Sequence, residues 1–101
     1  MIGNFYYKQS ANGNLLGEFS NNSTSSVIPD SCLLISIFQE NFVGSYQSTW
    51  IENENSSGIF TLEIQKLSNQ KFKLTWQNNE ITFLGEGFIV DNMLIGFYFP
   101  E

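Results

Sequence analysis

The chain alternates apolar and polar residues with a period of two, and this pattern constrains its fold more than any other feature. The clearest examples are Phe60-Thr61-Leu62-Glu63-Ile64-Gln65 and Phe72-Lys73-Leu74-Thr75-Trp76-Gln77. Successive side chains of a strand point to opposite sides, so such alternation is typical of a strand that buries one face. No segment keeps apolar residues at the i, i+3, i+4 and i+7 spacing of a helix. The sequence therefore predicts an all-β fold.

Tight turns separate the alternating segments. Pairs such as Asn78-Asn79 and Asp91-Asn92 suit two-residue hairpin loops, because Asn and Asp tolerate the left-handed backbone conformation. The short connections favour one antiparallel up-and-down β-barrel domain over residues 1–101, with a β-sandwich as the alternative. About eight short strands are expected, at residues 2–8, 15–20, 32–38, 42–50, 58–66, 71–77, 80–90 and 93–99.

Two polar stretches interrupt this rhythm and are predicted to be loops, at residues 21–29 and 51–57. The strand at 32–38 has an alternative, because Pro29-Asp30-Ser31 is also a suitable start for a short helix near residues 30–38. An unbroken apolar run does not distinguish the two.

The composition excludes several classes of function. The formal net charge is −6, with four lysines and neither arginine nor histidine, so we expect no nucleic-acid partner and no anionic membrane partner. The lack of histidine removes Ser-His-Asp catalysis and His-containing zinc sites. The acids Asp30, Glu52 and Glu54 match no calcium-binding loop, so neither a metal nor a cofactor is predicted. The start of the chain does not resemble a signal peptide, which makes a cytoplasmic location the expectation.

A short phrase, aliphatic-Gly-polar followed by an aromatic, recurs along the chain. It occurs as Ile2-Gly3-Asn4-Phe5, as Val43-Gly44-Ser45-Tyr46 and, loosely, as Leu84-Gly85-Glu86-Gly87-Phe88. Glycine inside a strand often marks a bend at a barrel corner. In this phrase and in its strand rhythm the chain resembles the avidin- and lipocalin-like (calycin-type) barrels, which implies a central pocket. No residue matches the set with which avidins hold biotin, so biotin is not predicted.

The hairpin at Asn78-Asn79 predicts which side chains face the core. As a two-residue turn it places Trp76 opposite Ile81 and Leu74 opposite Phe83. Together with the preceding alternating segment, it predicts a shared core of Phe60, Leu62, Ile64, Phe72, Leu74, Trp76, Ile81 and Phe83.

The last hairpin is apolar on both faces. With Asp91-Asn92 as its turn, the core face continues through Gly85, Gly87, Ile89, Leu94, Gly96 and Tyr98. Leu84 falls outside, together with six large residues nearer the turn: Phe88, Val90, Met93, Ile95, Phe97 and Phe99. Two interpretations stay open. Either these six form an interface between two copies of the chain, giving a homodimer, or a bulge at Gly85-Glu86-Gly87 exchanges the two faces.

Three functions are compatible with these features. The first is binding of a small apolar or aromatic ligand inside the barrel, by Tyr46, Trp50, Trp76 and Tyr98 with Glu86 as a carboxylate. The second is a solid-cored module that self-associates or binds a protein partner, in which those aromatics only fill the interior. The third is an enzyme that uses carboxylates and tyrosines, for which no catalytic residue is predicted.

Overall fold

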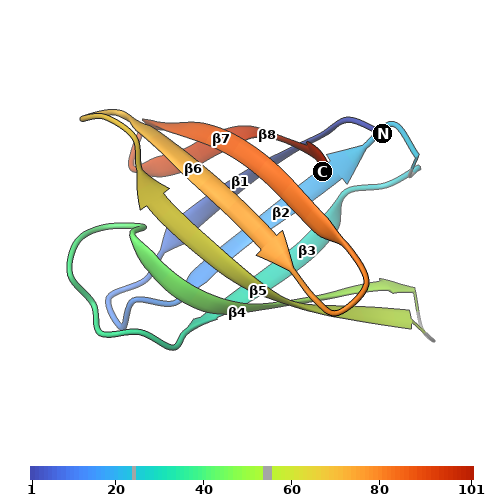
Figure 1. Cartoon of the computed structure of the whole chain (residues 1–101), viewed down its shortest axis with the longest axis horizontal. Coiled ribbons are helices and arrows are strands. Elements are labelled where there is room, and N and C mark those ends of the chain that lie inside the picture. The colour runs from blue at the N-terminus through green and yellow to red at the C-terminus, as the bar shows by residue number, and fades with distance from the viewer. Residues whose placement is uncertain (24, 54–55) are drawn as a thin grey trace.

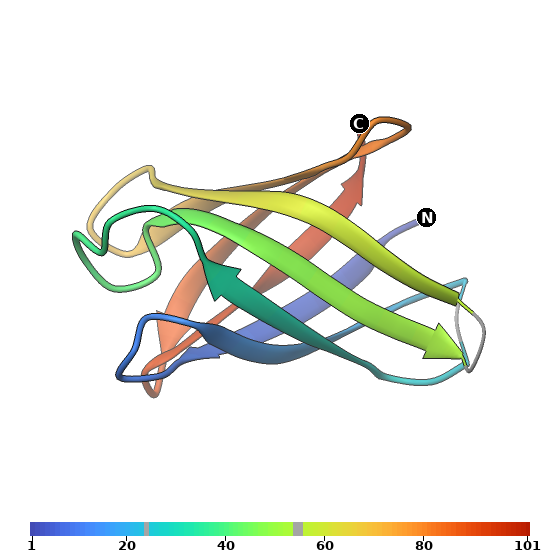
Figure 2. The same ribbon diagram turned by 90° about the horizontal axis from the view of Figure 1, so that it is seen from below.

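Eight antiparallel strands make up the computed structural model, which describes residues 1–23, 25–53 and 56–101 (Figure 1). Each strand pairs with the next one along the chain and β8 pairs back with β1, so the sheet is a closed up-and-down barrel (Figure 2). This confirms the predicted fold class. The strands are β1 (Gly3–Gln9), β2 (Leu15–Asn21), β3 (Ile28–Leu34), β4 (Gly44–Asn53), β5 (Ser56–Lys66), β6 (Lys71–Gln77), β7 (Thr82–Val90) and β8 (Met93–Pro100).

No segment among the described residues is a helix suited to cross a membrane.

β3 is where the predicted bounds were most wrong. It begins at Ile28 and ends at Leu34, whereas the strand was expected at residues 32–38 and a helix near 30–38 was the alternative. Buried Ile28, Asp30 and Cys32 alternate with exposed neighbours, so the period of two starts before the proline. Pro29 is tolerated because pairing with β4 begins only at Asp30, which leaves the missing N–H without consequence for that ladder.

The predicted acidic loop at residues 51–57 is also corrected. β4 continues through Asn53 and β5 begins at Ser56, and a shift in register lies between Ile51 and Asn53. Only residues 54–55 of that stretch lie outside the described residues. The two strands therefore form a longer hairpin than the polar sequence indicated.

The turn between β6 and β7 has four residues instead of the predicted two. Gln77 pairs with Thr82, and the side-chain oxygen of Asn78 accepts hydrogen bonds from the backbone N–H groups of Glu80 and Ile81. A shift of two residues leaves every side chain on its predicted face. Ile81 falls in the turn and is exposed, so its place in the core was wrong, whereas the other members of the predicted core are buried or packed against it.

The last hairpin follows its predicted register without interruption. Asp91 and Asn92 form the turn with positive φ angles, and Val90 pairs with Met93. No shift occurs around Gly85-Glu86-Gly87, so the bulge interpretation is wrong. Gly85 and Gly87 of β7 face the interior, and the large apolar residues Phe88 and Val90 of the same strand are exposed.

The two ends of the barrel differ. One end, called the closed end here, is covered by residues 35–43, from which Phe42 inserts into the interior and is 3% exposed. Its N–H donates to Gln9 Oε1 at 2.6 Å, and its carbonyl accepts the Tyr46 hydroxyl at 2.9 Å. The opposite end, called the open end, holds both termini and contains the cavity described next.

Candidate ligand-binding site

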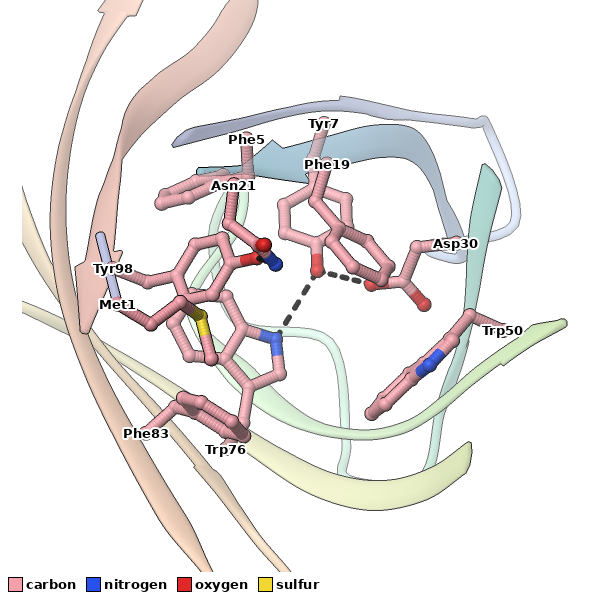
Figure 3. A pocket seen from close by; sticks show the side chains of 10 residues that line it. All are labelled: Met1, Phe5, Tyr7, Phe19, Asn21, Asp30, Trp50, Trp76, Phe83 and Tyr98. Carbon is pink, nitrogen blue, oxygen red and sulfur yellow. Dashed lines mark hydrogen bonds between the residues drawn. The ribbon is translucent and has the colours of Figure 1, made fainter. Parts of the chain in front are cut away.

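A cavity of about 90 Å³ lies inside the open end of the barrel (Figure 3). Seven of its ten lining residues are aromatic, and the only charged side chain among them is that of Asp30. The lining residues are Met1, Phe5, Tyr7, Phe19, Asn21, Asp30, Trp50, Trp76, Phe83 and Tyr98. Their side chains come from seven strands and from the start of the chain, so barrel closure itself assembles the site.

Strand register places the key residues in one row across the sheet. Tyr7 of β1 pairs with Gly17 of β2, Gly17 with Asp30 of β3, Asp30 with Trp50 of β4, and Trp50 with Gly58 of β5. Residues directly opposite each other on adjacent strands share a face. The row therefore brings Tyr7, Asp30 and Trp50 to one inward face, with a glycine between Tyr7 and Asp30 and another beside Trp50.

The glycines of this row make room for the large side chains. A Cβ atom at Gly58 would lie 2.3 Å from Cζ2 of Trp50, and one at Gly17 would lie 2.7 Å from Cδ1 of Tyr7. Both distances are too short for non-bonded carbon atoms. The Trp50 indole thus lies across Gly58, and the Tyr7 ring crosses Gly17 toward Asp30.

Asp30 is buried inside the barrel and is held by neutral donors. The Tyr7 hydroxyl donates to Asp30 Oδ2 at 2.5 Å, and the Ser48 hydroxyl lies 2.8 Å from Oδ1. The indole N–H of Trp76 donates in turn to the Tyr7 oxygen at 3.2 Å, as the dashed lines of Figure 3 show. This chain of hydrogen bonds fixes the carboxylate on the cavity wall.

Burial changes the acidity of these groups. Loss of solvation raises the pKa of the Asp30 carboxyl, and the hydrogen bonds from Tyr7 and Ser48 oppose this shift by stabilising the charged form. Loss of solvation also raises the pKa of the Tyr7 phenol well above its usual value, and the neighbouring Cys32 and Asp30 add to that effect. Tyr7 is therefore a neutral donor, and Asp30 is the group in this site that titrates.

Aromatic rings form the walls of the cavity around this carboxylate. Trp50 stacks on Phe60 at 4.7 Å between ring centroids and meets the edge of Phe19 at 5.5 Å. On the other side, Tyr98 contacts Trp76 and Phe83, each at 5.8 Å. The Tyr98 hydroxyl accepts a hydrogen bond from Asn21 Nδ2 at 2.8 Å. The walls are rigid because each ring packs on its neighbours.

Three of the five ligand-binding residues expected from the sequence line this cavity, namely Trp50, Trp76 and Tyr98. Tyr46 also faces the interior, but it lies at the closed end, fully buried beneath Phe42. Burial there raises its pKa to about 12. Tyr46 therefore belongs to the closed end and not to the cavity.

The structure corrects the expected place of Glu86. Gly85 and Gly87 face inward, so Glu86 points outward, where its Oε1 lies 3.6 Å from Lys71 Nζ. Glu86 is not part of the cavity. The carboxylate of the site is Asp30 instead.

Sequence reasoning missed Tyr7, Asp30 and Phe19. Tyr7 and Phe19 follow the ordinary alternation of β1 and β2, and this alternation could have predicted that their side chains face the interior. Asp30 was placed just before the strand predicted at residues 32–38, in a Pro-Asp-Ser run that also suits the start of a short helix. Its spacing of two from Ile28 and from Cys32 was the signal that places it inside.

The six outward residues of the last hairpin are accessible. Phe88, Val90, Phe97 and Phe99 are exposed, with Phe88 the most exposed at 52%, and Met93 and Ile95 are partly buried. Phe97 and Phe99 stack on each other on the outer face of β8.

Within residues 1–23, 25–53 and 56–101, no three histidine, cysteine, aspartate or glutamate side chains come together as metal ligands. Asp30 is the only buried carboxylate among the side chains that the structure describes. The Asp30 carboxylate can accept hydrogen bonds and can balance the charge of a cation.

No protein-family model matches the chain, and no curated protein or solved structure is significantly similar to it.

Proposed function

We propose that this protein binds a small ligand, or one compact group of a larger ligand, in the open end of its barrel. The observation that carries the proposal is the cavity itself, which combines aromatic walls with one anchored polar group. Binding sites for small molecules are typically apolar pockets with a few placed polar groups. The notion of a filled barrel suits the closed end, where Phe42 occupies the interior, and does not suit the open end.

The size of the cavity limits what enters. A volume of about 90 Å³ corresponds to roughly three water molecules, at about 30 Å³ each. It is smaller than the pockets of about 300–1,000 Å³ that enclose drug-sized ligands. A compact apolar group fits, and the rest of a larger ligand stays outside at the mouth.

The test uses a compact apolar alcohol, 3,3-dimethylbutan-1-ol, together with choline, its positively charged counterpart of the same shape. Both tryptophans of the chain line the cavity, so their indole N–H signals in NMR spectra report binding. At least one probe is expected to shift these signals saturably, with a Kd on the order of 1 mM, as suits so small a ligand. Phe88→Ala, on the outer face, is the control and leaves the shifts unchanged. Absence of saturable shifts with both probes would overturn the proposal.

We propose as a second function that the outer face of β7 and β8 joins two copies of the chain. The observation that favours it is the exposed apolar stripe of this face, on which Glu86 is already paired with Lys71 and Asp91 lies at the hairpin tip. Burying apolar surface stabilises association by about 25 cal/mol per Å². A patch that meets its own copy closes by a two-fold axis, which gives a dimer.

Light scattering tests the dimer. The double variant Ile95→Ser with Phe97→Ser is expected to turn a dimer into a folded monomer. The matched control replaces two exposed leucines of β2 and β3, as Leu16→Ser with Leu33→Ser, and leaves the dimer intact. A wild-type protein that is monomeric at about 100 μM would end this second proposal, because a dimer of such an interface is expected to persist there.

A further inference from the structure

Among the described residues, no positively charged group is paired with the carboxylate of Asp30. Asp30 is 4% exposed, and the donors that hold it, Tyr7 and Ser48, are neutral. Buried charges in proteins are normally paired, because removal from water costs free energy that hydrogen bonds alone restore only in part. Both ion pairs among the described side chains, Lys66 with Glu40 and Lys71 with Glu86, lie on the outside.

The charged side chains of the open end are all negative among the described residues, and the α-amino group of Met1 is the positive charge beside them. The described segments that form it are residues 1–5, 19–23, 25–30, 48–50, 58–62, 75–84 and 96–101, and they contain Asp30, Glu80 and Glu101 but no lysine or arginine. All four lysines of the chain belong to the halves of β1, β5 and β6 that lead to the closed end. A mouth with only negative side chains attracts cations and repels anions.

The aromatic rings beside Asp30 add a second attraction for a cation. The face of an aromatic ring carries partial negative charge, and a desolvated cation over Trp or Tyr gains from it. Trp50 is the direct cross-strand neighbour of Asp30, and Tyr7 is hydrogen bonded to it. Figure 3 shows Trp50 on the same side of the cavity as Asp30, with Tyr98 and Trp76 facing them.

From this arrangement we infer that the cavity takes a small organic cation, an alkylated ammonium group, with Asp30 as its counter-charge and the aromatic rings as its walls. The inference rests on the proposed binding function and specifies its ligand class. The volume of about 90 Å³ admits the ammonium head with its alkyl substituents. Any longer portion of the ligand then lies outside the barrel mouth.

The experiment compares the affinities of choline and 3,3-dimethylbutan-1-ol, which have the same shape and differ in charge. Choline is expected to bind at least about tenfold more tightly, the order of effect of a desolvated cation over aromatic rings. Equal affinity, or tighter binding of the alcohol, would overturn the cation inference and leave the binding function standing. Failure of both probes to bind would overturn both.

Two further measurements assign the selectivity to Asp30. Asp30→Asn is expected to remove the preference for choline and to leave the affinity for the alcohol within about twofold, since the amide keeps the shape and an acceptor for Tyr7. Glu80→Gln, which removes an exposed carboxylate at the same end, is the matched control and keeps the preference. If Asp30→Asn does not fold, a pH titration of binding to the wild-type protein tests the role of Asp30 instead.

In that titration, choline is expected to bind more weakly as the pH falls and Asp30 gains a proton, while the affinity for the alcohol stays the same. A choline preference that persists in Asp30→Asn, or that is independent of pH between about 4 and 8, would contradict the assignment.

Discussion

The closed and open ends of this barrel use similar residues for different purposes. At the closed end, Phe42 enters the interior, packs against Phe72 and has both its N–H and its carbonyl hydrogen bonded to inward side chains. At the open end, none of the buried apolar residues comes from the described parts of the loops, and the aromatic rings surround a cavity with a buried carboxylate. The comparison teaches that a small barrel obtains an internal cavity when one end is left unfilled, while the packed side chains of the other end supply stability.

The largest expected effect is the loss of the closed-end aromatic. Phe42→Ala is expected to lower the free energy of unfolding by about 3–5 kcal/mol, because it removes a buried ring and leaves a cavity. Reversible urea denaturation measures this change. Trp50→Ala, which removes a half-buried ring at the open end, should cost less. If Trp50→Ala lowers the free energy of unfolding more than Phe42→Ala does, the closed end is not the main source of stability.

A smaller effect is expected when only a hydroxyl is removed from the closed end. In Tyr46→Phe the carbonyl of Phe42 loses its donor, and Gln9 Nε2 keeps only its bond to the Gly13 carbonyl at 2.9 Å. A buried polar group left without its partner costs about 1–3 kcal/mol. Urea denaturation should show a loss in this range with unchanged probe binding at the open end. Loss of binding in Tyr46→Phe would show that the two ends are coupled.

The smallest effect concerns pH and the open end. The pKa of Asp30 is raised in the folded protein, so the folded state favours its protonated form. This contribution to stability is complete below the unfolded pKa of about 3.9 and is lost as the pH rises through the higher folded value. The groups around it, Tyr7, Cys32 and Ser48, carry no positive charge.

Comparison with Asp30→Asn isolates the contribution that protonation of Asp30 makes to the stability of the folded state. The free energy of unfolding of the wild type, minus that of the variant, should fall as the pH is raised from about 3 to 7. Denaturant titrations at several pH values measure the difference. A difference that rises with pH would mean that folding favours the charged carboxylate, and it would place Asp30 in a polar environment instead of a buried one.

The sequence predicted those parts of the barrel whose register depends on local chemistry. Asp91 and Asn92 fix a two-residue turn, and every pair of β7 and β8 follows from it. The alternation at Leu74 and Trp76 likewise fixed a face, and an error of two residues in the turn did not change it. Local turns and alternation suffice where adjacent strands are joined by short connections.

The candidate binding site could not be predicted in the same way, because its central row crosses long connections. Asp30 meets Gly17 and Trp50 through pairings of β3 with β2 and with β4, and neither connection is a two-residue turn. The row is set by which register buries the apolar faces over the whole closed sheet. Closure also brings Tyr7 of β1 beside Trp76 of β6, a contact between residues 69 positions apart.

The most direct test of the difference between the two ends is a map of backbone NMR shifts over the whole chain at saturating choline. We expect the shifts to be confined to the open end, around Tyr7, Asp30, Trp50 and Tyr98, with none at Gln9, Phe42 or Tyr46 at the closed end. Shifts that centre on the closed end, or that fall only on the outer face of β7 and β8, would contradict an open, ligand-binding end opposite a filled one.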